Sequence, residues 1–376
     1  MTRDASSMPD MRWRDYVLEG GVGLSSFWAG HLAEGERSVL IVLGRGFDPR
    51  SHAGLDMILA AGGGGVRDVL GLDYEEGDGS ASLAYAPRVH QNWEHIARAV
   101  GDRGGVGVRA LPFWSGTRRV GPLNAANVFT SPGELTRYQD VVVDISAMPR
   151  GIYFPLLARL LFLLDEAAPG QARRTNLHVI VADDPLLDSR IVDEGIDETA
   201  EFLHSFEGSF SREATGQQPK VWIPLLGEGR TTHFDRIYDR VKPDEICPVL
   251  PFPSKNPRRG DDIVQEYRDL LFDQHRLDPR SLMYAAEQNP FEVYRRVRKA
   301  VFHYRETLSL IGGCKVALSA LSSKLMSLGV LMVAYELKPL LDIGLAHIDC
   351  RGYRVEDFES SPELFGLWLA GECYAE

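Results

Sequence analysis

Short apolar runs of strand length alternate along the chain with longer segments of helical periodicity. This alternation is typical of βαβ units, so it predicts an α/β protein with mostly parallel sheets. The strands expected in the first half are residues 39–43, 69–72, 106–110, 141–145 and 177–182. Those expected in the second half are residues 220–226, 246–250, 282–285, 315–318 and 343–348. The clearest helices are expected at residues 154–166, 261–272, 291–311 and 325–337.

The same sequence landmarks recur in the same order in the two halves of the chain. Residues 39–46 are echoed by 221–229, 82–94 by 281–292, 145–150 by 318–324, and 178–183 by 345–349. A fixed order of four matches indicates an internal duplication. We therefore expect two tandem Rossmann-like units related by that duplication.

The predicted units are residues 1–204 and 220–376, joined by a linker at 205–219. The linker segment is rich in small and charged residues and poor in large apolar ones. A chain of 376 residues is long enough for two domains, each with its own core. Two similar halves would also create a cleft, and clefts bind ligands.

Charge and composition limit the kinds of partner that the protein can be expected to bind. The net charge of -12 argues against binding along a long nucleic acid, which requires a basic surface. The N-terminus has no signal-peptide core, and the longest apolar run, 152–164, is too short to span a bilayer. The four cysteines show no CxxC spacing and are expected to be reduced thiols. These features predict a cytoplasmic protein without a membrane partner.

A glycine-rich turn follows the first strong strand and precedes a predicted helix. Glycine at Gly44 and Gly46 lets a ligand approach the backbone, and Arg45 or Arg50 could pair with phosphate. Asp48 lies in the same turn. The sequence is neither a complete GxGxxG nor a Walker A loop, so an ordinary tight turn remains an equal alternative.

A second pair of turns follows later strands. Ser146 and Arg150 come after strand 141–145 and are candidate phosphate or ribose contacts, although Ser146 could simply cap the next helix. GxSxG is absent, so Ser146 is not expected to be a nucleophile. In the second half, Gly227 and Gly229 repeat the glycine turn.

Two further candidates follow strands of the second half. Glu287 and Asn289 could bind a ribose or a base edge, but an Asn-Pro pair also marks a helix start. Ser322, Ser323 and Lys324 form a hydroxyl-rich turn with one cation, directly before an apolar helix. This turn is the sharpest local signal in the second half.

At residues 319–329 the sequence resembles the CRISPR-associated Rossmann-fold (CARF) and SAVED domains, which sense cyclic oligonucleotides. Those families carry a hydroxyl-Gly-Thr-Lys type of turn, and Ser322-Ser323 stands here in place of Gly-Thr. SAVED domains look like two such units fused, which agrees with the duplication. The resemblance implies a ligand-sensing cleft with Ser322, Ser323 and Lys324 on one side and Ser146 and Arg150 on the other.

Three classes of function follow from these patterns. The first is a small-nucleotide-type ligand sensor or accessory factor in bacterial signalling or antiviral defence. The second is an enzyme acting on a nucleotide or nucleotide cofactor, S-adenosylmethionine included, with Asp48, Asp144 or Glu287 as acid or base. The third is a subunit that binds a protein partner. No cofactor can be named, and the histidines lack HExxH or another metal spacing, so no metal site is predicted.

Overall fold

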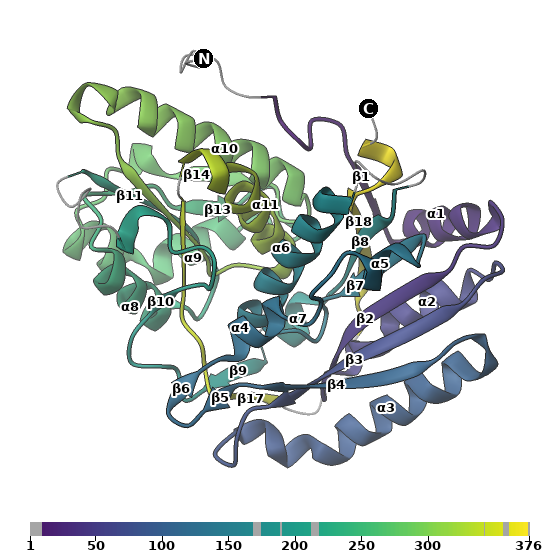
Figure 1. Cartoon of the computed structure of the whole chain (residues 1–376). Coiled ribbons are helices and arrows are strands. Elements are labelled where there is room, and N and C mark those ends of the chain that lie inside the picture. Colours follow the sequence, from purple (N-terminus) through teal and green to yellow (C-terminus); the bar gives the residue numbers. More distant parts are fainter. Residues whose placement is uncertain are drawn as a thin grey trace. The chain divides into compact units, whose positions relative to one another are not determined.

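The computed structural model describes residues 10–167, 174–188, 190–211, 218–341, 343–355 and 361–374. By its contacts the chain divides into two compact units, whose elements are labelled in Figure 1. Unit 1 comprises Met1–Tyr16 and Glu198–Ile348, and unit 2 comprises Val17–Asp197 and Asp349–Glu376. The chain therefore passes between the units three times, whereas the predicted division has a single linker at 205–219.

Unit 2 is built on a seven-stranded sheet in the order β1-β18-β8-β7-β2-β3-β4. These strands are β1 (Val17–Gly20), β2 (Val39–Arg45), β3 (Arg67–Glu75), β4 (Val106–Pro112), β7 (Asp140–Asp144), β8 (Asn176–Asp183) and β18 (Glu363–Ala370). Strands β8, β7, β2, β3 and β4 run parallel, while β18 lies antiparallel between β1 and β8. Two small antiparallel pairs join β5 (Trp114–Ser115) to β6 (Arg118–Arg119) and β9 (Ile191–Glu194) to β17 (Gly352–Val355).

Helices cover both faces of this sheet (Figure 1). On one face α1 (Gly21–Ala33), α2 (Ala53–Ala60) and α3 (Ala86–Val100) share a core with Val39, Ile41 and Leu43, alternate residues of β2. Because strand residues alternate between faces, Leu40 and Val42 of β2 point to the opposite side. The helices of that side are α4 (Gly121–Ala126), α5 (Gly133–Thr136) and α6 (Arg150–Ala167). Shorter turns are η1 (Pro49–His52), η2 (Ala81–Tyr85), η3 (Gly101–Arg103), α7 (Pro185–Asp188) and η10 (Glu372–Tyr374).

Unit 1 has a second sheet in the order β10-β16-β15-β11-β13-β14, with β12 paired to β11. Its strands are β10 (Glu201–Phe202), β11 (Lys220–Leu225), β12 (Glu245–Ile246), β13 (Val249–Pro251), β14 (Met283–Ala285), β15 (Lys315–Ala320) and β16 (Gly344–His347). The strands β16, β15, β11, β13 and β14 are parallel, and β10 is antiparallel to β16. The helices are α8 (Thr231–Val241), α9 (Arg259–Glu266), α10 (Pro290–Thr307) and α11 (Lys324–Leu341), with a π-helical turn η7 (Asp269–Gln274) and 3-10 turns η5 (Gly208–Ser211), η8 (Pro279–Ser281) and η9 (Ser309–Ile311).

The N-terminal segment belongs to unit 1 although unit 2 follows it in sequence. Trp13 is fully buried and packs edge-on against Tyr294 of α10, with ring centroids 5.4 Å apart. Tyr16 stacks on Phe291 of the same helix at 4.2 Å. Aromatic pairs of this kind bury a large apolar area, so this short segment is anchored to α10 by packing.

Part of the predicted linker also belongs to unit 1. Phe206 is buried, and its carbonyl accepts the Leu345 N–H. Phe210 packs on Phe202 with ring centroids 4.8 Å apart. Residues 205–211 therefore pack against unit 1, and residues 212–217 of the predicted linker lie outside the described residues.

The parallel strands of the two sheets have the same order. In each unit the chain forms the central strand first, adds two strands on one side, and then adds two on the other. This is the 3-2-1-4-5 order of doubly wound folds. Each sheet also places an antiparallel strand beside the fifth, β18 beside β8 and β10 beside β16.

The sequence landmarks agree with this order in three of four cases. Residues 39–46 and 221–229 contain β2 and β11, 145–150 and 318–324 join β7 to α6 and β15 to α11, and 178–183 and 345–349 contain β8 and β16. The fourth pairing, 82–94 with 281–292, is wrong. Ala81–Tyr85 is a 3-10 turn leading into α3, whereas Met283–Ala285 is a strand paired to β13. A similarity of five residues does not determine whether a segment forms a strand. Pairing with a neighbouring strand determines that, and only residues 283–285 find such a partner.

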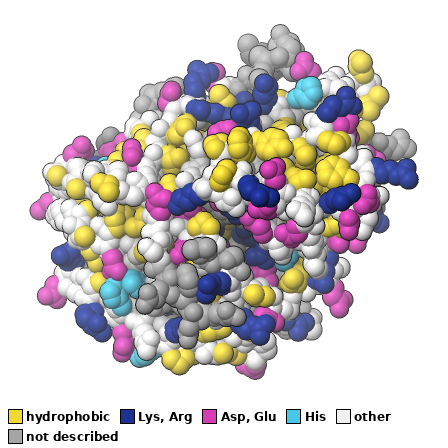
Figure 2. Space-filling model, turned by 180° about the vertical axis from the view of Figure 1, so that it is seen from behind, with side chains coloured by type: hydrophobic (Ala, Val, Ile, Leu, Met, Phe, Trp, Pro, Cys, Tyr) yellow, Lys and Arg dark blue, Asp and Glu magenta, His cyan; other side chains and the backbone are white. Residues whose placement is uncertain are grey.

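All the predicted strands overlap observed strands, and the four predicted helices overlap α6, α9, α10 and α11. No range was predicted for α2, α3 and α8, nor for β1, α1, β10 and β18, which lie outside the regular βαβ alternation. Among the described residues, none of the helices combines the length and apolar character needed to cross a bilayer. Figure 2 shows basic and acidic side chains interspersed over one face of the protein.

Candidate functional site

The strand order of each sheet reverses at one point. In unit 2 this point lies between β2 and β7, and in unit 1 it lies between β11 and β15. Doubly wound sheets bind ligands outside the carboxyl ends of their strands at such a point. The sequence-predicted residues lie in the turns that leave these strands and their neighbours, so the two edges can be compared directly.

In unit 2 the glycine turn is shaped by packing. A Cβ on Gly44 would lie 2.2 Å from the Tyr74 hydroxyl and 3.1 Å from the Ala147 carbonyl oxygen. A glycine is therefore required where β2, β3 and the turn after β7 meet. The Tyr74 hydroxyl is buried and has no hydrogen-bond partner among the described residues, and burial raises its pKa above the ordinary value.

Asp48 and Arg50 of the same turn are bonded within the protein. Arg50 is 1% exposed, and its guanidinium contacts Asp48 at 2.7 Å and Asp188 at 2.8 Å. Asp48 Oδ1 also accepts the Arg50 N–H and caps η1. Because two carboxylates already surround the buried cation, this arrangement favours a structural role for both residues over phosphate binding.

The other unit 2 candidates are also held by internal contacts. Ser146 is fully buried, and its Oγ accepts the Ala182 N–H at 2.8 Å, which ties the turn after β7 to β8. Arg45 forms an ion pair with Asp73 at 2.8 Å and lies over the Trp93 ring. Arg150 is partly buried and begins α6. Gly46 follows β2, and its carbonyl accepts a hydrogen bond from Asn92 of α3.

In unit 1 the two central turns touch each other. A Cβ on Gly227 would lie 2.5 Å from the Leu321 carbonyl oxygen and 2.9 Å from Ser322 Cα. The hydroxyl of Tyr267, after α9, donates to the Gly227 carbonyl at 3.0 Å. The turn after β11 and the turn after β15 thus meet at the point where the strand order reverses.

The hydroxyl-rich turn begins the 18-residue helix α11. Ser323 Oγ accepts the Met326 N–H at 3.3 Å, as a capping side chain does. Ser322 is 4% exposed, and its hydroxyl donates to the Met326 sulfur at 3.2 Å. Lys324 is only partly buried and is the first residue of the helix. This terminus therefore combines helix amides with a cation, the usual surroundings of a bound anion.

A charged cluster lies beside this turn, formed by Glu228, Arg259 and Glu287. Arg259 Nε donates to Glu228 at 2.6 Å, and the same guanidinium pairs with Glu287. Glu287 is almost completely buried, whereas the Glu228 side chain is 48% exposed. Arg259 begins α9, so this cluster connects the turns after β11 and β14 to that helix.

The carboxylates of this edge differ in their proton affinity. Burial raises the pKa of Glu266 above its ordinary value, and the neighbouring Glu228 carboxylate adds to this, although the Gly229 N–H donates to Glu266 at 2.9 Å. Burial acts in the same direction on Glu228, but the hydrogen bonds and charge of Arg259 outweigh it and lower the Glu228 pKa. Gly229 itself has a left-handed φ of 69°.

Asn289 has a structural role in the described structure. Its side-chain oxygen accepts the N–H groups of Phe291 and Glu292, and it caps α10. Its amide nitrogen donates to the Tyr16 hydroxyl at 3.1 Å. The sequence pattern singled out neither Glu228 nor Glu266. Glu228 could have been noticed because it lies between the two glycines of its turn.

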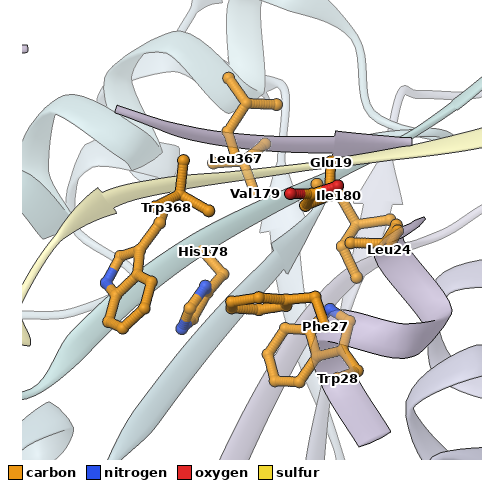
Figure 3. Close-up of a pocket in the computed structure, with 11 residues that line it drawn as sticks. Glu19, Leu24, Phe27, Trp28, His178, Val179, Ile180, Leu367 and Trp368 are labelled. Carbon is orange, nitrogen blue, oxygen red and sulfur yellow. The ribbon is translucent and has the colours of Figure 1, made fainter. Parts of the chain in front are cut away.

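A pocket in unit 2 lies between α1, β1, β8 and β18. Figure 3 shows Phe27 and Trp28 of α1 facing His178 of β8 and Trp368 of β18, with Glu19 on the far side. Its cavity volume is about 10 Å³, close to the lower limit for one water molecule. This pocket is too small for a nucleotide and contains none of the predicted residues.

The structure brings histidines and aspartates together in two places that sequence spacing did not reveal. His31, Asp140 and His178 form a buried cluster, and His52, Asp56 and His95 form a part-exposed one. In each case the members come from different elements, so no motif of fixed spacing marks them in the sequence.

Comparison with known proteins identifies no family. No family model matches the chain, and no curated protein matches it. A solved structure of an uncharacterised protein from Mycobacterium Paratuberculosis is 10% identical, with 86% of this chain and 89% of that chain covered and a TM-score of 0.22. A functionally unknown protein from Pseudomonas aeruginosa PAO1 is 10% identical, with 83% and 92% covered and a TM-score of 0.20. Similarities this small assign neither a family nor a function to the chain.

Proposed function

We propose that unit 1 binds a nucleotide-type ligand at the carboxyl edge of its sheet, and that the protein is a sensor or accessory factor in bacterial signalling or defence. The observation that carries the proposal is the close contact between the Gly227 turn and the Ser322 turn. They meet where the strand order reverses, the position at which doubly wound sheets hold ligands.

The chemistry of this edge is suited to such a ligand. Lys324 and the first amides of α11 favour a phosphate, because a helix N-terminus carries partial positive charge. The half-exposed Glu228 is held by Arg259 and can accept hydrogen bonds from ribose hydroxyls. The resemblance of residues 319–329 to CARF and SAVED turns places cyclic oligonucleotides among the first ligands to test.

The corresponding turns of unit 2 differ from those of unit 1, and this difference supports a ligand site in unit 1. At its corresponding edge Arg50 is enclosed by Asp48 and Asp188, and Ser146 bonds to β8. The common strand order is what an internal duplication would leave, and we infer that the two units arose in this way. In this interpretation unit 1 retains a ligand site at the carboxyl ends of its strands. In unit 2 the side chains at the corresponding position bind one another instead.

One observation favours an enzyme as the second candidate. Glu228 and Glu266 lie near each other, with the pKa of one lowered and that of the other raised. Such a divergence is characteristic of carboxylates that act as base and acid. In that case Glu266 would donate a proton and Glu228 would accept one from a nucleotide substrate.

The first experiment is a thermal-shift screen of the full chain against mononucleotides, dinucleotide cofactors, S-adenosylmethionine and cyclic oligonucleotides. A ligand at 100 times its dissociation constant stabilises a protein by about 2.7 kcal/mol. Lys324→Ala should weaken the affinity about tenfold or more, since a hydrogen bond to a charged group contributes roughly 1.5–3 kcal/mol. Arg150→Ala is the matched control, because Arg150 begins α6 as Lys324 begins α11.

The outcomes separate the candidates. Loss of affinity in Lys324→Ala with normal affinity in Arg150→Ala supports a unit 1 site, and equal loss in both shows that the ligand also depends on unit 2. Product formation that disappears in Glu266→Gln while ligand affinity persists would establish the enzyme instead. A screen without any shift would contradict the proposal and direct attention to protein partners.

A further inference from the structure

The His52, Asp56 and His95 side chains of unit 2 meet on the surface of two neighbouring helices. His52 Nδ1 lies 2.7 Å from one Asp56 carboxylate oxygen. His95 Nε2 lies 2.9 and 3.0 Å from the two oxygens of the same carboxylate. The two imidazole rings are in contact, with centroids 4.1 Å apart. Three potential ligand atoms are thus gathered within 4.8 Å of one another.

Packing of the fold creates this arrangement. His52 is the last residue of η1, and Asp56 follows four residues later in α2, so both side chains lie on one helical face. His95 comes from α3, which shares the core under α2 on the same face of the sheet. Asn92 of α3 donates to the carbonyls of Gly46 and Asp48, which fixes α3 against the turn after β2.

The donor set is that of a transition metal. Two imidazoles with one carboxylate bind zinc in sites where a further position stays open, whereas magnesium and calcium prefer oxygen ligands. Tetrahedral zinc with bonds of about 2.0–2.1 Å needs ligand atoms about 3.3 Å apart. The two imidazole–carboxylate separations, 2.7–3.0 Å, are about half an ångström shorter than this, and all three ligand atoms lie within 4.8 Å of one another.

Charge and access also favour a cation at this place. Asp56 places a carboxylate, the anionic ligand of the set, directly between the two imidazoles. The three side chains are 25%, 39% and 43% exposed. An ion could therefore enter from solvent and keep a water ligand.

The buried cluster of His31, Asp140 and His178 contains the same residue types but has the contacts of a structural cluster. There Asp140 is fully buried and accepts hydrogen bonds from Arg37 and Asn176 as well as from His31 and His178. The Arg37 cation would repel a metal ion, and the other donors occupy the carboxylate oxygens. No arginine or lysine of the described residues is paired with Asp56 in this way.

We propose that His52, Asp56 and His95 bind a divalent transition metal ion of the zinc type. The ion takes the place of the contacts that now join the imidazoles to the carboxylate. Bound there, it links the start of α2 to the middle of α3. Because Asn92 connects α3 to the turn after β2, the ion also stiffens that turn.

The test uses the full chain with any affinity tag removed and with metal stripped by a chelator. Calorimetric titration with Zn²⁺ should show one site in the wild type. Asp56→Asn and His95→Ala should each weaken Zn²⁺ binding at least tenfold, since each removes a ligand. Co²⁺ should give the visible absorption of a low-coordinate site in the wild type and lose it in both variants, and Mg²⁺ should not compete.

His90→Ala is the matched control. His90 lies on α3 beside Glu94 at 3.2 Å and is more exposed than His95, but among the described residues no third ligand joins this pair. Its removal should leave Zn²⁺ affinity unchanged. The far-ultraviolet circular dichroism of every variant checks that it is folded, and the isosteric Asp56→Asn keeps the test valid if His95→Ala is unfolded. Absence of Zn²⁺ binding, or equal affinity in the wild type and Asp56→Asn, would overturn the proposal.

Discussion

At the scale of single residues, the same side-chain types take different roles in the two units because their neighbours differ. Arg50 of unit 2 is enclosed by two carboxylates, whereas Lys324 of unit 1 begins a helix and is only partly buried. Gly44 and Gly227 also differ. The first makes room for a tyrosine hydroxyl, and the second makes room for the backbone of a neighbouring turn.

The contact at Gly44 gives a prediction that separates packing from ligand binding. Gly44→Ala places a methyl group 2.2 Å from the Tyr74 hydroxyl, and overpacking of this kind costs about 1–3 kcal/mol. Tyr74→Phe removes that hydroxyl, which is buried without a described partner. The double variant should therefore regain part of the stability lost in Gly44→Ala. Urea unfolding of the four proteins measures this coupling, and strictly additive effects would show that the clash is relieved elsewhere.

At the scale of elements, one carboxylate joins three parts of unit 2. Asp140 begins β7, accepts a hydrogen bond from His31 of α1 at 2.8 Å and is contacted by His178 of β8 at 3.2 Å. Arg37, between α1 and β2, supplies the compensating charge. A buried carboxylate is tolerated here because several donors surround it.

Removing the Asp140 charge should destabilise the packing of α1, β7 and β8 against one another. Asp140→Asn removes the buried carboxylate that pairs with Arg37 and leaves it only the part-exposed Glu372 at 2.9 Å, so it should lower the free energy of unfolding by about 3 kcal/mol. Asp278→Asn, in an exposed pair with Arg280, is the control and should change stability little. Chemical denaturation at pH 7 measures both. An effect of Asp140→Asn no larger than the control's would show that the cluster contributes nothing to stability.

The same cluster predicts how stability depends on pH. Burial works to raise the pKa of Asp140, but hydrogen bonds from His178, His31 and Arg37 outweigh it and hold the pKa far below its ordinary value. Burial lowers the pKa of His178. For both groups the unfolded chain binds protons more readily, so stability falls on acidification, first below about pH 6.5 and further below about pH 4. Asp140→Asn should show a flatter profile below pH 5 when unfolding is measured across pH 3–8.

At the scale of the whole molecule, the chain is interleaved between its units. Residues Glu198–Ile348 of unit 1 are inserted within unit 2, whose last strand β18 pairs along the length of β8. The two ends of the insertion lie together, because the Asp197 N–H donates to the Asp349 carbonyl at 2.9 Å. Arg119 contacts the carboxylates of both residues.

This arrangement predicts which fragments fold. A chain of residues 17–197 joined by a short Gly-Ser linker to residues 349–376 should fold cooperatively, because it contains every strand of the unit 2 sheet. Residues 1–204 alone, the unit expected from sequence, lack β18 and should be unfolded or aggregated. Circular dichroism and urea titration of the two fragments decide this. A cooperative unfolding transition of the 1–204 fragment would show that the unit 2 sheet folds without β18.

The sequence by itself determined the α/β class, the positions of the parallel strands and four of the helices between them, α6, α9, α10 and α11. These features depend on local periodicity, which each segment of the chain carries on its own. It also located the turns at the carboxyl ends of β2, β7, β11 and β15, because those turns directly follow apolar strands.

Only the tertiary structure decided how distant segments are combined. The antiparallel edge strands, the docking of Trp13 on α10, the partners of Arg50 and the meeting of His52 with His95 all depend on contacts far apart in sequence. Local pattern cannot specify such contacts, because burial and partner choice are set by packing of the complete fold. The physical difference is one of range: periodicity is local, whereas the neutralisation and exposure of a side chain are not.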